Sequence, residues 1–528
     1  MDSNAALQVA QDTLWVLSPE LLLLLTAVVM MTAGVFVRQP RQVWSLVSAV
    51  ALGFALVALL LVRGTTTDAY TAVALNDDFS FYSRLVLLLS GYLLLGLAHD
   101  QVDAERAPEF FGSLLMIMAG SLMVAAANEL VFLFVGLELI SIPTYLLLYL
   151  PVRNTTTQEA ATKYFFLSIF SSGLLLYGLA FLYGTTGVSN LKALAYLAGP
   201  GHLPNLPQPQ FGMIALVFVL AGLGFRVAAV PFHFYAPDVY EGSPTVMAAL
   251  LSWIPKAVGF LAIIRTLTAV ISSGGDSNLL VGKAVILCWI IAAVTMTLGN
   301  AVALLQDNLK RLFAYSSIAH AGYLMVGVTV AFYNGPDAKG AFLGTQGILF
   351  YLVAYALMTL GAFGIFIALS TPERPVQTVE DLTGLGRSHP VTALCLAVCL
   401  FSLAGIPPLA GFWGKFQIFY SAFGAASGSD ARTFQLLAVI GVLNSAAGAY
   451  YYLRIVVNMY LRPLPSAIPP LQPRPAGPTQ LAIACCVILT LVLGFFPNTV
   501  SAPSRTAAKA AVALPPPSAP PVQQAAAR

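Results

Sequence analysis

The chain has 528 residues, of which 58% are hydrophobic and only 9% are charged. A soluble domain carries about 25% charged residues, so this composition excludes an ordinary soluble enzyme and indicates a polytopic membrane protein. The formal net charge of +3 is small and the basic residues are dispersed, which argues against nucleic acid as a partner. The five cysteines lie in apolar stretches without a metal-binding spacing, so no metal site is expected.

Apolar stretches of about 20 residues, the length that spans a bilayer, recur along the chain. They predict an all-α fold with about fourteen transmembrane helices, centred near residues 27, 53, 89, 118, 139, 172, 221, 257, 294, 321, 356, 400, 446 and 488. Lys and Arg are more frequent in the connections after odd-numbered helices, which predicts that both termini lie outside. The expected division is helices 1–3 in residues 1–105, helices 4–8 in 106–270, helices 9–13 in 271–462, a loop and helix 14 in 463–500, and a disordered Ala/Pro-rich tail in 501–528.

Five charged side chains stand in or against these apolar stretches. A charge at the bilayer centre costs roughly 2.5–3.5 kcal/mol, so such residues usually face the bundle interior or a water path. The set therefore predicts ion or proton transfer through the membrane. Its members are Glu138, Lys163, Arg226, Lys256 and Lys415.

Two predicted spans are interrupted by proline beside a buried cation. Helix 7 (AGLGFRVAAVPFHFYAPD) breaks at Pro231 and Pro237, and helix 12 (SLAGIPPLAGFWGKF) breaks at Pro407 and Pro408. Proline removes a backbone donor, so each break exposes peptide groups inside the membrane. The breaks are five helices apart, which predicts two inverted five-helix repeats, helices 4–8 and 9–13, with the broken helices at the ion site. Proline kinks without a transport role are the alternative.

Several motifs resemble the antiporter-like subunits of respiratory complex I, and within them the family of subunit N of bacterial NADH-quinone oxidoreductase, the counterpart of mitochondrial subunit 2. The resemblance extends from about Phe110 to Tyr460. It rests on FVGLELISIPTYLL, ATKYFFLSIFSSG, VPFHFYAPDVYEGSPT, QDNLKRLFAYSSIAHAGYL and SLAGIPPLAGFWGKF.

The resemblance implies a partner for Glu138. In the family this glutamate pairs with a helix 7 lysine that modulates proton transfer, but here the matching position is Arg226. Arginine stays charged in proteins, whereas a buried lysine releases its proton readily. Arg226 is therefore expected to act as a fixed-charge partner of Glu138, and a charge pair that only positions helices 5 and 7 is the alternative.

Three lysines and one histidine complete the predicted path. Lys256 lies mid-span and matches the central helix 8 lysine of the family, and Lys415 matches its helix 12 lysine. Lys163 matches a family lysine too, although an ordinary surface pair with Glu159, four residues earlier, also explains it. His320 on helix 10 is a candidate bridge between Lys256 and Lys415, or else a hydrogen-bonded packing residue.

Three polar residues after the helix 7 break are candidates for a cytoplasmic inlet or, alternatively, polar loop residues: His233, Asp238 and Glu241. The resemblance implies a bacterial inner-membrane protein without its own cofactor. NADH, FMN, iron-sulfur clusters and quinone are expected in partner subunits, and the partners include a second antiporter-like subunit and small membrane subunits. Two alternatives remain open, namely a subunit of a multi-subunit cation/proton antiporter and a non-pumping scaffold.

Overall fold

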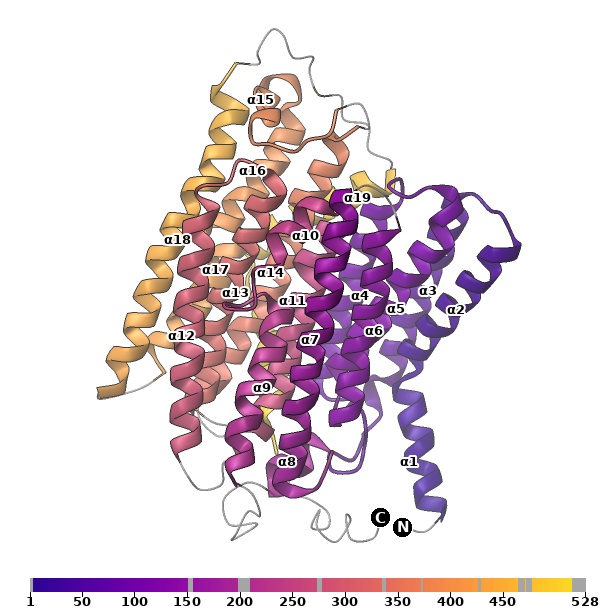
Figure 1. Cartoon of the computed structure of the whole chain (residues 1–528), viewed down its shortest axis with the longest axis vertical. Helices are drawn as coiled ribbons and strands as arrows, with labels where there is room; N and C mark the ends of the chain where they lie inside the picture. Colours follow the sequence, from indigo (N-terminus) through magenta and orange to yellow (C-terminus); the bar gives the residue numbers. More distant parts are fainter. Residues whose placement is uncertain are drawn as a thin grey trace.

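The computed structural model describes residues 3–150, 155–197, 209–272, 278–334, 339–371, 374–425, 429–463, 471 and 477–514 (Figure 1). Short 3₁₀ helices lie at Val62–Gly64, Ala104–Arg106 and Glu380–Leu382. The α-helices are α1 (Ser3–Val16), α2 (Ser18–Phe36), α3 (Arg41–Leu61), α4 (Asp78–Ala98), α5 (Ala107–Ala126), α6 (Leu130–Tyr149), α7 (Thr155–Thr186), α8 (Leu191–Leu197), α9 (Pro209–Val227), α10 (Ala236–Gly242), α11 (Thr245–Ser272), α12 (Asn278–Ala303), α13 (Leu309–Asn334), α14 (Lys339–Leu369), α15 (Leu385–Ser388), α16 (Pro390–Ala404), α17 (Ala410–Phe423), α18 (Ser429–Leu461), α19 (Gly477–Phe495) and α20 (Asn498–Val512).

The prediction of an all-α polytopic membrane protein is confirmed. Within the described residues, twelve helices are long and apolar enough to cross a membrane, and two shorter apolar helices lie at Phe211–Val227 and Pro390–Ala404. Each of the fourteen predicted centres falls inside one of these helices. The assignment of two inverted repeats and the division into domains stay predictions.

The helices form a bundle in which most run along the long axis of the molecule (Figure 1). α2 and α3 lie at one side of the view, and α12 and α18 lie at the other. Between them, α11 is buried along its whole apolar stretch, and α13 and α14 nearly so. The outer helices expose large apolar side chains, as expected of surfaces that face lipid, for example Phe54 and Leu443. The interior of the bundle is therefore built around α11, α13 and α14.

The two predicted helix breaks are present. α9 ends at Val227 and α10 begins at Ala236, while α16 ends at Ala404 and α17 begins at Ala410. Neighbouring side chains satisfy peptide groups at the first break: Thr295 accepts from the Val230 nitrogen, and the Tyr235 hydroxyl donates to the Phe225 carbonyl, both at 3.0 Å. At the second break, Gly405 adopts a φ of 88°, a conformation that favours glycine.

The prediction of a disordered tail is wrong for residues up to 512, and residues 515–528 lie outside the described part of the chain. Alanine is the strongest helix former, so the Ala-rich part of the tail folds as α20, whereas most of the prolines lie beyond it. α20 buries Ala507, Ala508 and Ala511 against the bundle. Lys192 of α8 caps the C-terminal end of α20 by donating hydrogen bonds to the backbone oxygens of Ala511 and Ala513.

An ion pair between the buried Arg265 and the partly buried Asp77 joins the start of α4 to α11. Asp77 accepts two hydrogen bonds from Arg265, each 2.9 Å long, and Arg265 also donates to the Ala125 carbonyl and the Ser80 hydroxyl. Burial alone raises the pKa of the Asp77 carboxyl, but the charge and hydrogen bonds of Arg265 outweigh it and lower the pKa to about 2. The pKa of Asp77 is thus below the ordinary aspartate value of 3.8. The pair therefore stabilises the fold fully above pH 3.8, and this stabilisation is lost as the pH falls toward 2.

We expect Arg265→Ala to destabilise the subunit by about 3–5 kcal/mol at neutral pH, because it leaves the Asp77 charge buried without its partner. The thermal unfolding midpoint of the purified complex and the amount of subunit in the membrane measure this loss. Arg38→Ala is the control, since Arg38 is exposed. Equal midpoints for both variants would show that the pair contributes no stability.

Candidate functional site

Arg226 lies in the last turn of α9, where the partial negative charge of the helix end favours a cation. Its guanidinium donates to the Leu137 carbonyl at 3.0 Å, to the Ser141 hydroxyl, and to a Glu138 carboxylate oxygen at 2.9 Å. The same carboxylate oxygen accepts from the Ser172 hydroxyl at 2.5 Å. The structure thus brings the predicted pair into contact, with Arg226 held by three oxygens of α6 that match its fork of donors.

Lys163 lies apart from this pair. Its Nζ atom is 2.7 Å from a carboxylate oxygen of Glu159 and 2.7 Å from one of Asp238. Ser172 lies nine positions after Lys163, which corresponds to about 13 Å along α7. The surface pair with Glu159 is therefore present. Lys163 also contacts Asp238 on α10, and it lies at a different height along the bundle from Glu138.

The carboxylates after the first break form a polar network with α13. Arg311 donates to Asp238 at 2.9 Å and to Glu241 at 2.7 Å, and Asn308 donates to Glu241 at 3.2 Å. This network lies at the end of α10 and the start of α13. His233, the third inlet candidate, lies before α10, and its buried Nδ1 atom has no hydrogen-bond partner in the described structure.

A polar pocket of about 370 Å³ opens beside this network, between the starts of α7 and α13 and the end of α10. Glu241, Asn308 and Lys310 line it. The next residue inward on α10, Tyr240, is buried, and its hydroxyl lies 3.5 Å from the Ser317 hydroxyl of α13. Tyr240 therefore links α10 to α13 inside the bundle, next in sequence to a residue that lines the pocket.

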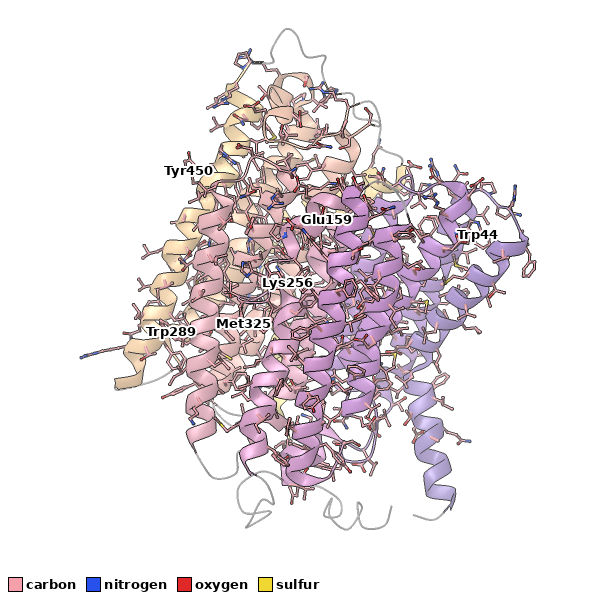
Figure 2. The ribbon with its side chains drawn as sticks, in the orientation of Figure 1. Trp44, Glu159, Lys256, Trp289, Met325 and Tyr450 are labelled. Carbon is pink, nitrogen blue, oxygen red and sulfur yellow. The ribbon has the colours of Figure 1, made fainter. Side chains whose placement is uncertain are left out.

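Lys256 lies near the middle of the bundle, as Figure 2 shows, and only 2% of its surface is exposed. α11 carries it, and its Nζ atom donates to the backbone carbonyl and the hydroxyl of Ser317 on α13. The ammonium also lies over the ring of Tyr355 on α14, 4.8 Å from the ring centre. Three helices of the buried core thus meet at this lysine.

His320 lies one turn after Ser317 on α13 and is fully enclosed. Its Nδ1 atom is hydrogen-bonded to the hydroxyl of Tyr351, and its Nε2 atom lies 3.0 Å from the hydroxyl of Tyr452. Tyr452 also exchanges a hydrogen bond with Ser316. The histidine therefore binds tyrosine hydroxyls with both nitrogens, and neither nitrogen is hydrogen-bonded to Lys256 or Lys415.

The second helix break forms the binding site of Lys415. Its Nζ atom donates to the carbonyls of Leu403 and Ala404 at 2.9 and 3.0 Å, and to the Ser445 hydroxyl at 2.9 Å. Leu403 and Ala404 are the last two residues of α16, and the final carbonyls of a helix have no partner within it. The break thus supplies the oxygens that hold a buried cation, and the ring of Tyr323 lies 5.0 Å from the same ammonium.

Known proteins share this architecture. A family model described as "NADH:quinone oxidoreductase/Mrp antiporter, TM" matches residues 127–441. NADH-quinone oxidoreductase subunit N of Trichlorobacter lovleyi is 39% identical over 474 residues, which cover 88% of this chain and 91% of the relative. The chain belongs to the subunit N family.

Chains of solved membrane complexes share the fold of this chain. A chain of respiratory complex I from Thermus thermophilus is 31% identical, with a TM-score of 0.73, and the match covers 92% of this chain and 98% of that chain. A chain of the Mrp complex from a Dietzia species gives a TM-score of 0.76 over 95% of this chain and 97% of that chain. Its identity of 20% shows a shared fold alone.

In this member of the subunit N family, sequence reasoning missed the side chains that enclose the lysines and the histidine. Tyr351 and Tyr355 are four residues apart and share one face of α14, a spacing that is visible in the sequence. No sequence pattern pointed to Ser445 as a ligand of Lys415, because a single serine in a long apolar helix is usually a packing residue. The residues concerned are Tyr351, Tyr355, Ser445 and Tyr452.

Proposed function

We propose that this chain is a proton-translocating membrane-arm subunit of NADH-quinone oxidoreductase. The observation that carries the proposal is the pair of buried lysines, Lys256 and Lys415, each of which shares a tyrosine ring with the buried His320. Buried ionisable residues in membrane helices are costly and usually mark a transfer path. Neutral imidazole both accepts and donates a proton, so His320 suits a relay between two lysines.

Protons would enter at the pocket beside Glu241 and pass the Tyr240 hydroxyl to Ser317 and Lys256. From Lys256 they would reach Lys415 by way of His320 and its tyrosine hydroxyls. Hydroxyl groups suit such a relay because each one both donates and accepts a hydrogen bond.

The Glu138 and Arg226 pair would act as a fixed charge beside this path. Arg226 is a poor proton donor, so its role would be electrostatic. Lys163 would modulate the network at the inlet rather than the Glu138 pair, because its bonds go to Glu159 and Asp238.

The chemistry that drives this transfer would occur in other subunits. Relatives of this chain are named as subunits of NADH-quinone oxidoreductase, so we infer that NADH, FMN, iron-sulfur clusters and quinone bind partner chains. The partners would be other membrane subunits of the same assembly, including a second antiporter-like subunit and small membrane subunits. The assembly would lie in the bacterial inner membrane.

Purification through a tag on this chain tests the proposal against a cation/proton antiporter, which the fold shared with an Mrp complex keeps as the second candidate. We expect quinone reductase and iron-sulfur subunits to co-purify. We also expect vesicles that hold the assembly to pump protons when NADH and quinone are supplied. Co-purification of small membrane proteins only, without NADH-driven pumping, favours the antiporter.

A further inference from the structure

Each central lysine lies over the face of a tyrosine ring. The Nζ atom of Lys256 is 4.8 Å from the ring centre of Tyr355, and that of Lys415 is 5.0 Å from the ring centre of Tyr323. Both distances are within the range of a cation–π contact, which is strongest where the pair is removed from water. Both lysines and both tyrosines are buried, so this condition is met.

The same two rings pack on His320. The imidazole lies 5.1 Å from the ring of Tyr355, and 5.5 Å from that of Tyr323 at an interplanar angle of 88°. Tyr323 and His320 come from α13, whereas Tyr355 comes from α14. Each lysine is therefore linked to the histidine through one aromatic ring that contacts both.

The two ammonium groups differ in their other contacts. An ammonium has three donors, and Lys415 places them on three oxygens, of Leu403, Ala404 and Ser445. The hydrogen bonds of Lys256 go to two oxygens, both of Ser317. The ring of Tyr355 therefore carries a larger share of the stabilisation of its lysine than the ring of Tyr323 does.

We propose that Tyr355 and Tyr323 are positioning residues of the proton path, whose ring faces hold Lys256 and Lys415 next to His320. The inference rests on the proposed function and adds to it the residues that fix the lysines. The inference assigns this role to the ring, because each ammonium lies over a ring face. The effect is larger at Tyr355, where the lysine has fewer oxygens.

Two substitutions at Tyr355 separate the ring from the hydroxyl. Tyr355→Phe keeps the ring face and removes the hydroxyl, whereas Tyr355→Leu removes the ring and keeps an apolar side chain. Proton pumping per NADH oxidised is measured in vesicles with the intact assembly, together with the amount of assembled complex. We expect the Phe variant to pump within about twofold of wild type and the Leu variant to lose roughly three- to tenfold.

Tyr82 on α4 provides a matched control, because its hydroxyl donates to the Leu349 carbonyl and the residue lies outside the lysine site. We expect Tyr82→Leu and Tyr82→Phe to pump equally. If Tyr355→Leu fails to assemble, Tyr323→Leu and Tyr323→Phe make the same comparison at Lys415, with the same order and a smaller difference.

Equal losses in the Phe and Leu variants would overturn the inference, since the hydroxyl would then be the acting group. Normal pumping in the Leu variant would overturn it as well. Failure of the proposed function is distinguishable: in that case wild type shows no NADH-driven pumping, or Lys256→Ala pumps normally, whatever the Tyr355 variants do.

Discussion

Lys256→Ala is expected to abolish proton pumping and to reduce NADH:quinone electron transfer with it. The alanine removes the ionisable group at the meeting point of α11, α13 and α14 and leaves the Ser317 hydroxyl and the Tyr355 ring without the ammonium. The proposed path from the pocket at Glu241 would then end before His320. Because electron transfer and pumping are coupled in such an assembly, a blocked path should slow both.

The two activities are measured in vesicles that contain equal amounts of assembled complex. Lys283→Ala is the matched control, because it removes an exposed lysine from α12 and should change neither activity. Normal pumping and electron transfer in Lys256→Ala would identify the chain as a scaffold that holds the membrane arm together.

Arg226→Ala is expected to impair pumping several-fold, and Arg226→Lys is expected to preserve or improve it. The alanine variant leaves Glu138 with the Ser172 hydroxyl but without its cation. A charge that loses its partner in a largely buried position costs about 3–5 kcal/mol. The electrostatic influence of the ion pair on the path would then be lost. Lysine restores the charge and can release a proton.

Pumping by the two Arg226 variants is compared at equal amounts of assembled complex, with Arg38→Ala as the control at an exposed arginine. Unchanged pumping in Arg226→Ala would show that the Glu138–Arg226 pair does not contribute to proton transfer. A lower rate in the lysine variant than in wild type would show instead that the guanidinium fork, with its bonds to Leu137 and Ser141, positions α6 and α9.

Much of the fold follows from simple properties of the sequence. The bilayer demands long apolar helices, so all fourteen predicted centres lie inside helices. The breaks near Pro231 and Pro407 were predicted from proline, which removes a backbone donor, whereas Pro143 and Pro255 lie inside unbroken helices. The need of Glu138 for a partner was expected from its position in a membrane helix. The resemblance to the subunit N family pointed to Arg226 as that partner, and the structure places the two in contact.

Other features depend on packing that no sequence pattern states. Lys163 was expected either in the proton path or in a surface pair with Glu159; the structure shows that pair and adds a contact with Asp238 on α10, which the sequence did not predict. The tail was expected to be disordered from its Ala and Pro content, yet α20 is stabilised by burial against the bundle. The link of His320 to tyrosine hydroxyls also required the structure, because Tyr351 and Tyr452 come from helices far apart in the sequence.

The way α16 ends has a consequence for how this subunit can vary. Two of the three oxygens that hold Lys415 are backbone carbonyls, at Leu403 and Ala404, and a carbonyl is present whatever side chain stands there. Substitutions at these two positions that keep the helix end in place should leave the cation site intact. The side chains that matter to the site are those of Lys415 itself, Ser445 and Tyr323, together with the residues that stop the helix, such as Gly405. The site thus depends mainly on the backbone conformation at the end of α16. The side chains of Leu403 and Ala404 should therefore be free to change, although both residues contact the charge directly.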